Sequence, residues 1–333
     1  MFAPFMVEGQ NFIADTRSDA SQKINGITVV APANPFENNP LTSLEKLAAG
    51  WVAVIPYAYT RKNQPSVYYN VPRQWWGEKS EGITTIIRKA KEEGLSCMLK
   101  PHVYVPGGWV GDLSYTNNDD WEKWEKEYKA YIMLYVQIAI EEKVEIFCIG
   151  TEFKKAIQER TSFWIGLIKD IRKVYNGKLV YSSNWDAYQT VPFWKYLDYI
   201  GLSAYFPLDE DVLPEKSNLR QKWKPIKKKM EKFSSSNNKP ILFTEYGYLS
   251  VDGCAGKTWE LEKKVHTLSI NEEAQAVALD VLYESFWNEK FWAGGFLWKW
   301  FPDMQGHEGY PQKDYTPQNK IAETIIAKWY GKK

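Results

Sequence analysis

The sequence predicts an α/β fold built as one domain, a single (β/α)8 or TIM barrel. Three observations support this prediction: the chain has 333 residues, eight short apolar runs recur along it, and helix-periodic segments separate these runs. The runs are continuous rather than alternating, which is typical of parallel strands covered on both faces. A doubly wound open sheet is the structural alternative, but no Gly-rich phosphate-binding turn follows the first run.

Each apolar run is short enough to be one buried strand, and polar or turn-forming residues bound it. In chain order, the predicted strands are GITVVA (26–31), WVAVIP (51–56), SCMLKP (96–101), EIFCIGT (145–151), KLVYSS (178–183), YIGLSA (199–204), ILFT (241–244) and GGFLW (294–298). Residues 25–330 therefore form the predicted barrel domain, and residues 1–24 form an N-terminal extension.

The clearest predicted helix begins near Asn117, where Asn and Asp side chains can cap it. One face of this helix is apolar and mostly aromatic, and it carries Trp121, Trp124, Tyr128, Tyr131, Tyr135 and Ala139. The other predicted helices cover 42–49, 80–93, 162–175, 217–233, 271–288 and 317–329, and the weakest helical pattern is at 190–197.

The predicted loops are unequal in length. Connections from helix to strand are short, whereas the long strand-to-helix connections cover 57–79, 102–118, 205–216, 246–270 and 299–316. In a barrel these long loops gather at the C-terminal face, where active sites lie. They contain many of the 16 Trp and 21 Tyr residues of the chain, which predicts an aromatic cleft suited to sugars. A large aromatic core is the alternative explanation for this composition.

Composition excludes several classes of function. The formal net charge of +1 gives no reason to expect binding to nucleic acid or to an anionic membrane. No apolar run approaches the length of a membrane span. The opening residues lack the pattern of a signal peptide, but a removed signal would leave no trace, so the compartment stays open between the cytoplasm and the cell exterior.

Two glutamates follow predicted strands at equivalent places. Glu152 follows the fourth run and Glu245 follows the seventh, and in a barrel these two strand ends face each other across the mouth. A pair of carboxyl groups so placed suits glycoside hydrolysis, in which one protonates the leaving oxygen and the other attacks the anomeric carbon or activates water. The two must then differ in pKa, although they titrate as a coupled pair. The alternative is that each glutamate caps a helix or pairs with a lysine.

Several segments resemble glycoside hydrolase family 113 of clan A. They are IGTEF (149–153), FTEYGY (243–248), YIGLSAYFPL (199–208), GGFLWKWF (294–301) and YTPQNKIAETIIAKWY (315–330). All of clan A shares the two glutamate motifs, and the last two segments narrow the resemblance to this family. It spans nearly the whole chain and implies a (β/α)8 fold and a retaining endo-β-1,4-mannanase acting on mannan, glucomannan or manno-oligosaccharides.

The resemblance also implies roles for individual residues. Glu152 would be the general acid/base and Glu245 the nucleophile. Tyr205 would donate a hydrogen bond to the nucleophile, and Trp298 would form the aromatic floor beneath the sugar at the cleavage point. Trp300 lies on the same side of its strand by simple alternation and is a second candidate for that floor. Most clan members have Asn before the acid/base, where this chain has Thr.

Five further residues are expected to line the cleft. Asn184 and Trp185 follow the fifth predicted strand, His102 and Lys100 lie at the end of the third, and Tyr57 follows the second. Asn184 has an equally good explanation as a turn cap, and His102 has one as a structural hydrogen-bonding residue.

No metal and no cofactor are expected, because His266 and His307 lie in loops without a second ligand at suitable spacing. The expected partner is a β-mannan-type polysaccharide or oligosaccharide, bound by a monomer. Within enzymes, the alternatives are an exo-acting β-mannosidase, a transglycosylase, or a glucan or xylan hydrolase on the same scaffold. A non-catalytic carbohydrate-binding barrel is the alternative from another class.

Overall fold

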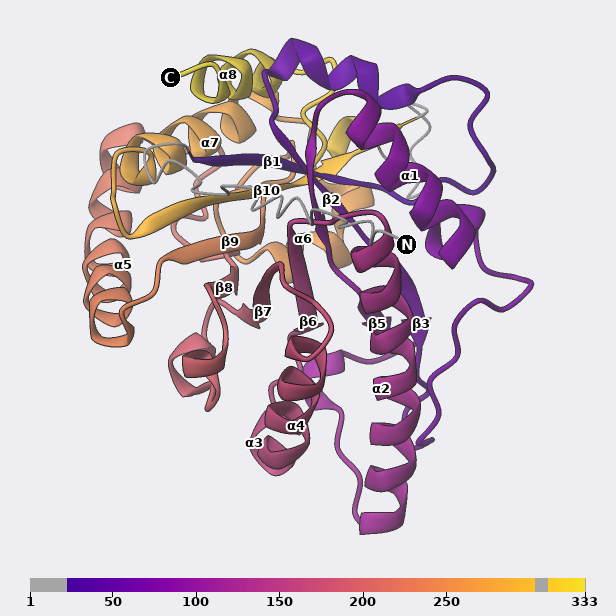
Figure 1. The fold of residues 1–333 in the computed structure, drawn as a ribbon. Coiled ribbons are helices and arrows are strands. Elements are labelled where there is room, and N and C mark those ends of the chain that lie inside the picture. Colours follow the sequence, from indigo (N-terminus) through magenta and orange to yellow (C-terminus); the bar gives the residue numbers. More distant parts are fainter. Residues whose placement is uncertain (1–22, 303–310, 333) are drawn as a thin grey trace, which may run out of the picture.

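The computed structural model describes residues 23–302 and 311–332, and its central element is a closed parallel barrel (Figure 1). Neighbouring strands around the barrel follow the order β1-β10-β9-β8-β7-β6-β4-β2. The barrel strands are β1 (Ile24–Val29), β2 (Trp51–Val54), β4 (Ser96–Leu99), β6 (Ile146–Thr151), β7 (Lys178–Asn184), β8 (Ile200–Ser203), β9 (Ile241–Tyr246) and β10 (Trp292–Trp300). Each of the eight predicted strands overlaps one of them, so the predicted fold class is confirmed.

Two short strands lie beyond the barrel rim, where the sequence pattern predicts only loops. Strands β3 (Tyr57–Tyr59) and β5 (His102–Tyr104) pair in parallel. The backbone N–H groups of Lys100 and His102 donate to Val54 and Pro56, both at 2.9 Å. The pairing of β2 with β4 therefore continues past the barrel and holds Tyr57 and His102 at its mouth.

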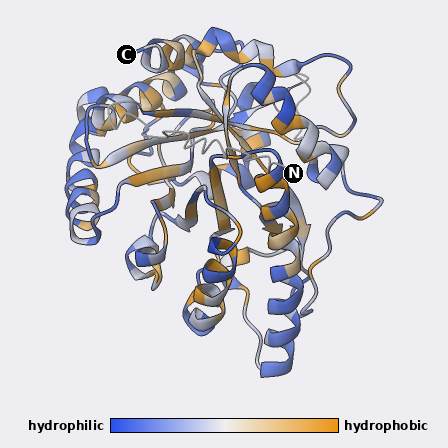
Figure 2. Cartoon of the chain, viewed as in Figure 1, coloured by the Kyte–Doolittle hydropathy of each residue, from blue (hydrophilic) through white to orange (hydrophobic). Residues whose placement is uncertain are grey.

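Helices surround the barrel, and their apolar faces pack on the strands (Figure 2). The α-helices are α1 (Ser80–Glu92), α2 (Asn118–Glu141), α3 (Ala156–Glu159), α4 (Thr161–Arg172), α5 (Lys216–Asn237), α6 (Thr258–Lys263), α7 (Glu272–Phe286) and α8 (Ile321–Tyr330). The cap of α2 is as predicted, because Asn117 Oδ1 accepts from the backbone N–H of Asp120 at 2.8 Å. The segment predicted as helix over 42–49 forms a 3-10 helix, η1 (Pro40–Leu47).

The weakest predicted helix, 190–197, does not form an α-helix. Two 3-10 turns, η4 (Tyr188–Thr190) and η5 (Trp194–Tyr196), connect β7 to β8 instead. Short 3-10 turns η2 (Trp76–Glu78), η3 (Val110–Asp112), η6 (Val265–Thr267) and η7 (Pro311–Lys313) lie in the long connections.

Most of the aromatic surplus belongs to the layer between barrel and helices. The largest completely buried side chains include Trp124, Trp164 and Trp223. Trp124 stacks on Tyr128 with ring centroids 4.7 Å apart, and Phe153 packs on Trp164 at 5.2 Å. Such rings bury large apolar areas and favour offset or edge contacts. The large aromatic core therefore explains much of the composition that suggested a sugar-binding cleft.

The barrel interior changes from apolar to polar along its axis. Its apolar layer contains Ile24, Ala53, Met98, Ile146, Cys148, Val180, Leu242 and Phe296. Nearer the C-terminal ends of the strands, the Ser182 hydroxyl lies 2.6 Å from that of Thr244 and 3.1 Å from that of Ser203. These buried hydroxyls satisfy one another and place a polar layer beneath the barrel mouth.

The predicted N-terminal extension (1–24) lies almost entirely outside the described residues and stays a prediction, as does the domain boundary. Over residues 23–302 and 311–332, no helix is long and apolar enough to cross a membrane.

Candidate active site

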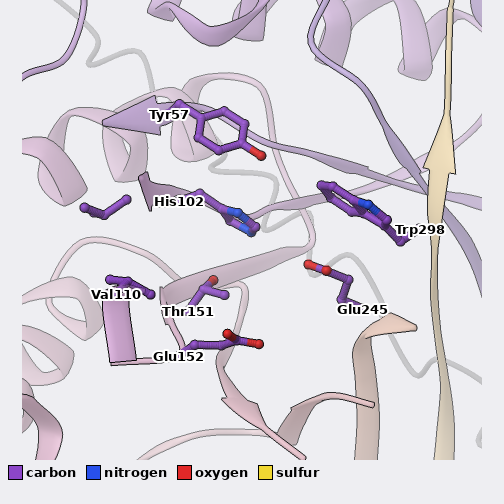
Figure 3. A pocket seen from close by; sticks show the side chains of 8 residues that line it. Tyr57, His102, Val110, Thr151, Glu152, Glu245 and Trp298 are labelled. Carbon is purple, nitrogen blue, oxygen red and sulfur yellow. The ribbon is translucent and has the colours of Figure 1, made fainter. Parts of the chain in front are cut away.

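A cavity of about 210 Å³ opens at the C-terminal end of the barrel (Figure 3). Its lining residues come from both the barrel strands and the long loops: Tyr57, His102, Val103, Val110, Thr151, Glu152, Glu245 and Trp298. Glu152 and Glu245 thus reach the same cavity from β6 and β9, as the positions of the two motifs predict.

Strands β6 and β9, which bring Glu152 and Glu245 to the cavity, each contain an irregularity in register relative to a neighbouring strand. Between Cys148 and Thr151, β6 has one residue more than β7, and between Phe243 and Glu245, β9 has one residue more than β8. Such bulges re-aim side chains, and they are common next to active sites. In β9 the bulge lets Thr244 reach the polar layer inside the barrel while the next residue, Glu245, reaches the cavity.

Glu152 follows directly after β6 in a left-handed backbone conformation, with φ of 58°. Residues other than glycine adopt this region rarely, and such residues are concentrated at functional sites. Its backbone is fixed on both sides, because its N–H donates to Ser182 at 2.8 Å and its carbonyl accepts from Lys154 at 2.7 Å. Its side-chain Oε2 accepts from Trp109 Nε1 at 2.8 Å.

Glu245 has two short contacts, one to each carboxylate oxygen. The Tyr205 hydroxyl donates to Oε1 at 2.6 Å, and Lys100 Nζ donates to Oε2 at 2.6 Å. Tyr205 therefore occupies the position that the resemblance implies for it. Lys100 was expected to face substrate, but its side chain is completely buried and it forms an ion pair with Glu245.

These surroundings shift the two carboxyl groups in opposite directions. Burial, reinforced by the nearby charge of Glu245, raises the pKa of Glu152 above its ordinary value. Burial acts in the same direction on Glu245, but the charge and hydrogen bond of Lys100, together with the bond from Tyr205, bring its pKa below the ordinary value. One carboxyl group is therefore suited to carry a proton and the other to carry a negative charge.

Aromatic rings and unpaired polar atoms complete the cavity. The rings of His102 and Trp298 lie parallel with centroids 6.4 Å apart, and Tyr57 packs on His102 edge to face at 5.4 Å. Burial and the charge of Lys100 lower the pKa of His102 to about 3, so its ring is neutral near pH 7. His102 Nε2 and Thr151 Oγ1 are buried and have no hydrogen-bond partner within the described part of the chain. A ligand that carries hydroxyl groups can satisfy both atoms.

Trp300 does not reach this cavity, contrary to the expectation from alternation. In the pairing of β10 with β1, Trp298 pairs with Thr28 and Trp300 pairs with the next residue, Val29, so Lys299 is an additional residue in β10. Because of this irregularity, Trp300 is buried in the layer between barrel and helices, where Lys46 Nζ lies 5.3 Å from its ring centroid.

Asn184 and Trp185 also lie outside the cavity lining. Asn184 Oδ1 accepts from the backbone N–H of Trp185 at 3.0 Å, which matches its explanation as a turn residue. Trp185 packs on Phe206 and stacks on Trp259 with centroids 6.0 Å apart. His307 lies outside the described residues, and His266 belongs to η6 and is not among the lining residues.

The sequence places Trp109 among the aromatic residues of the long loops, but it does not predict the contact of Trp109 with Glu152, nor that Val103, Val110 and Thr151 line the cavity. Val103, Trp109 and Val110 belong to the predicted strand-to-helix connection 102–118, where neither helical nor strand periodicity indicates which way a side chain points. A Trp between glycines in the stretch GGWVG (107–111) is the signal that the sequence offers for Trp109.

Solved structures with the same fold include glycoside hydrolases. The chain is similar to the GH113 β-mannanase AaManA from Alicyclobacillus acidocaldarius in complex with ManMIm, with 23% identity, a TM-score of 0.78, and coverage of 93% of this chain and 97% of that one. A second GH113 β-1,4-mannanase structure has 24% identity, a TM-score of 0.79, and coverage of 94% and 100%. A β-glucuronidase from Ruminococcus gnavus has 13% identity, a TM-score of 0.62, and coverage of 93% and 50%.

No curated protein sequence matches this chain. The model of Glycoside Hydrolase Family 113, however, matches residues 33–320, a span that contains both cavity glutamates and every barrel strand except β1. On this match, the protein belongs to glycoside hydrolase family 113.

Proposed function

We propose that this protein is a retaining endo-β-1,4-mannanase that acts on mannan, glucomannan or manno-oligosaccharides by double displacement. The observation that carries the proposal is the pair Glu152 and Glu245, which line one cavity and have pKa values displaced in opposite directions. Family membership supports glycoside hydrolysis. The β-mannanase activity named for two similar structures supports the choice of substrate.

In the first step, the Glu152 carboxyl group gives its proton to the glycosidic oxygen as the bond from that oxygen to the anomeric carbon breaks. A carboxylate oxygen of Glu245 forms a bond to the anomeric carbon, and the leaving sugar departs as an alcohol. Tyr205 and Lys100 hold the nucleophile by one contact to each of its oxygens. Positioning of this kind lowers the barrier of the reaction, because the attacking oxygen is already oriented.

In the second step, Glu152 has become a carboxylate and accepts a proton from water. The water oxygen bonds to the anomeric carbon as the bond to Glu245 breaks, and this restores both side chains to their starting states. The raised pKa of Glu152 suits a group that must first donate and then accept a proton near neutral pH.

Three side chains are suited to bind the sugar at the cleavage point. The partly exposed Trp298 ring offers a flat apolar surface for the C–H groups of a pyranose. His102 Nε2 and Thr151 Oγ1 offer polar atoms without protein partners among the described residues. Thr151 stands where most of the clan has Asn, and the axial 2-hydroxyl of mannose is a suitable partner for a different side chain at this place.

A time course with mannohexaose tests this proposal. We expect mannobiose, mannotriose and mannotetraose as early products, and ¹H NMR should show the β-anomer at the new reducing end before mutarotation. Mannose and mannopentaose as the first products would indicate an exo-acting β-mannosidase, and the α-anomer as first product would contradict the double displacement. Tight mannan binding without cleavage would indicate a carbohydrate-binding barrel.

A further inference from the structure

An exposed tryptophan outside the barrel contacts the acid/base residue directly. Trp109 lies in the connection between β5 and α2, and its indole Nε1 donates to Glu152 Oε2 at 2.8 Å. The Trp109 side chain is 38% exposed, whereas Val110, the next residue, lines the cavity. The indole thus reaches the carboxyl group from the loop side of the site.

The loop that carries Trp109 is tied to the segment that follows Glu152. The backbone N–H of Lys155 donates to the carbonyl of Gly111 at 3.0 Å, and Lys155 Nζ forms an ion pair with Asp112 at 3.0 Å. The Ser114 hydroxyl donates to Glu159 Oε2 at 2.6 Å. Three contacts therefore fix the two segments relative to each other, so the bond from Trp109 to Glu152 belongs to a larger connected unit.

Gly111 leaves room for the indole ring of Trp109, because it has no side chain. A Cβ atom at this position would lie 2.4 Å from Cη2 of Trp109 and 2.5 Å from two further ring atoms. Only a residue without a side chain lets the ring lie against the backbone here. The same glycine gives its carbonyl to Lys155, so one residue sets both the ring position and the link between the two segments.

An indole N–H donates hydrogen bonds and accepts none. While it is bound to Oε2, it favours the arrangement in which the proton of neutral Glu152 resides on Oε1. We propose that Trp109 is a positioning residue that holds the acid/base through Oε2 and leaves Oε1 to exchange the proton with the substrate and water. This inference rests on the proposed role of Glu152 as the general acid/base.

The contact is also one of several influences on the pKa of Glu152: burial and the charge of Glu245 raise it, whereas the hydrogen bonds from Trp109 and Ser203 and the charge of Lys100 lower it. A donated hydrogen bond stabilises the carboxylate more than the carboxylic acid, so it lowers the pKa and opposes the raising effect of burial. Without Trp109 Nε1, Glu152 would keep its proton to higher pH. The negative charge that forms on Glu152 during the first step would also lose a stabilising partner.

The test compares Trp109→Phe, Gly111→Ala and wild type. Trp109→Phe removes the N–H but keeps an aromatic ring, and Gly111→Ala keeps the indole but displaces it. For both variants we expect the alkaline limb of the pH profile of kcat/KM on mannotetraose to move up by about one pH unit, as expected for the loss of one hydrogen bond to a carboxylate. At the pH optimum, kcat/KM should fall about tenfold on mannotetraose and little on a dinitrophenyl β-mannoside, whose leaving group needs no proton.

Trp75→Phe is the matched control, because Trp75 is 39% exposed and does not line the cavity. Its alkaline limb should coincide with that of wild type, and thermal melts should show that all variants fold. An unmoved limb in Trp109→Phe and Gly111→Ala would overturn the inference. A ¹³C NMR titration of the Glu152 carboxyl group gives the same comparison without turnover. An inactive wild type would therefore count against the proposed function, whereas an unshifted titration would count against Trp109.

Discussion

At the scale of single residues, the site depends on giving two identical carboxyl groups different surroundings. Lys100 is completely buried and reaches Glu245 Oε2 at 2.6 Å, whereas Glu152 accepts a hydrogen bond from Trp109 and forms no ion pair with any residue in 23–302 or 311–332. A buried charge of this kind is stable only with its partner, since removal of one member leaves the other unpaired in a poorly solvated place. Lys100 and Glu245 therefore act as one unit: their ion pair stabilises the fold, and Lys100 favours the ionised form of Glu245.

Lys100→Met tests this unit. We expect the free energy of unfolding at pH 7 to fall by about 3 kcal/mol, because Glu245 is left buried without its cation. Chemical denaturation measures this loss. The double variant Lys100→Met/Glu245→Gln, which removes both charges, should recover part of it, and a double variant no more stable than Lys100→Met would contradict the pairing.

The same substitution has a predicted effect on pH dependence. Lys100 helps to hold the pKa of Glu245 below its ordinary value, so the ionised Glu245 stabilises the fold above its unfolded pKa, and this stabilisation is lost as the pH falls through the folded pKa. In Lys100→Met the pKa of Glu245 rises. The acid limb of kcat/KM should therefore move to higher pH, and an acid limb in the wild-type position would show that Lys100 does not set this ionisation.

At the scale of elements, irregular strands decide which side chains reach the site. Strands β6, β9 and β10 each depart from regular register close to Glu152, Glu245 and Trp298. Alternation along a regular strand has a period of two, so one additional residue reverses the side on which all later side chains lie. In β10 this reversal separates Trp298 from Trp300.

Trp298 and Trp300 should therefore respond differently to the same substitution. Trp300→Ala leaves a large void among buried residues and should lower the free energy of unfolding by about 3–5 kcal/mol. Trp298→Ala should cost less stability but should lower kcat/KM on manno-oligosaccharides at least tenfold, because it removes the apolar surface proposed to lie beneath the sugar. Denaturation curves and kinetics on the two variants measure both effects, and a reversed pattern would contradict the register of β10.

These strands also show how far sequence predicts the structure. Continuous apolar runs locate all eight barrel strands, because burial on both faces requires them. They do not locate the bulges, since an additional residue in a run leaves its composition unchanged, and for this reason Trp300 was expected in the site. Strands β3 and β5 have three residues each, too few for a periodic pattern. The partner of Lys100 lies 145 residues away, so only the fold brings the two together.

At the scale of the whole molecule, most of the large buried aromatic side chains and the cavity occupy different parts of the barrel. The layer between barrel and helices holds the large aromatic side chains, and the lower barrel interior is apolar. The hydroxyls of Ser182, Ser203 and Thr244 then form a polar layer near the C-terminal end, and the cavity with the two glutamates opens beside it. In this arrangement the packed layers support the barrel, and the loops and strand ends supply the groups that line the cavity.

The measurement that tests the central claim most directly is the release of reducing ends from glucomannan, with xylan and carboxymethylcellulose as parallel substrates. Wild type, Glu245→Gln, Glu152→Gln and the control Glu231→Gln, on the exposed side of α5, are compared at equal concentration. We expect release from glucomannan by wild type and the control, and a loss of at least 1000-fold, on the order expected for a missing nucleophile, in Glu245→Gln. Wild-type activity in Glu245→Gln would contradict the account.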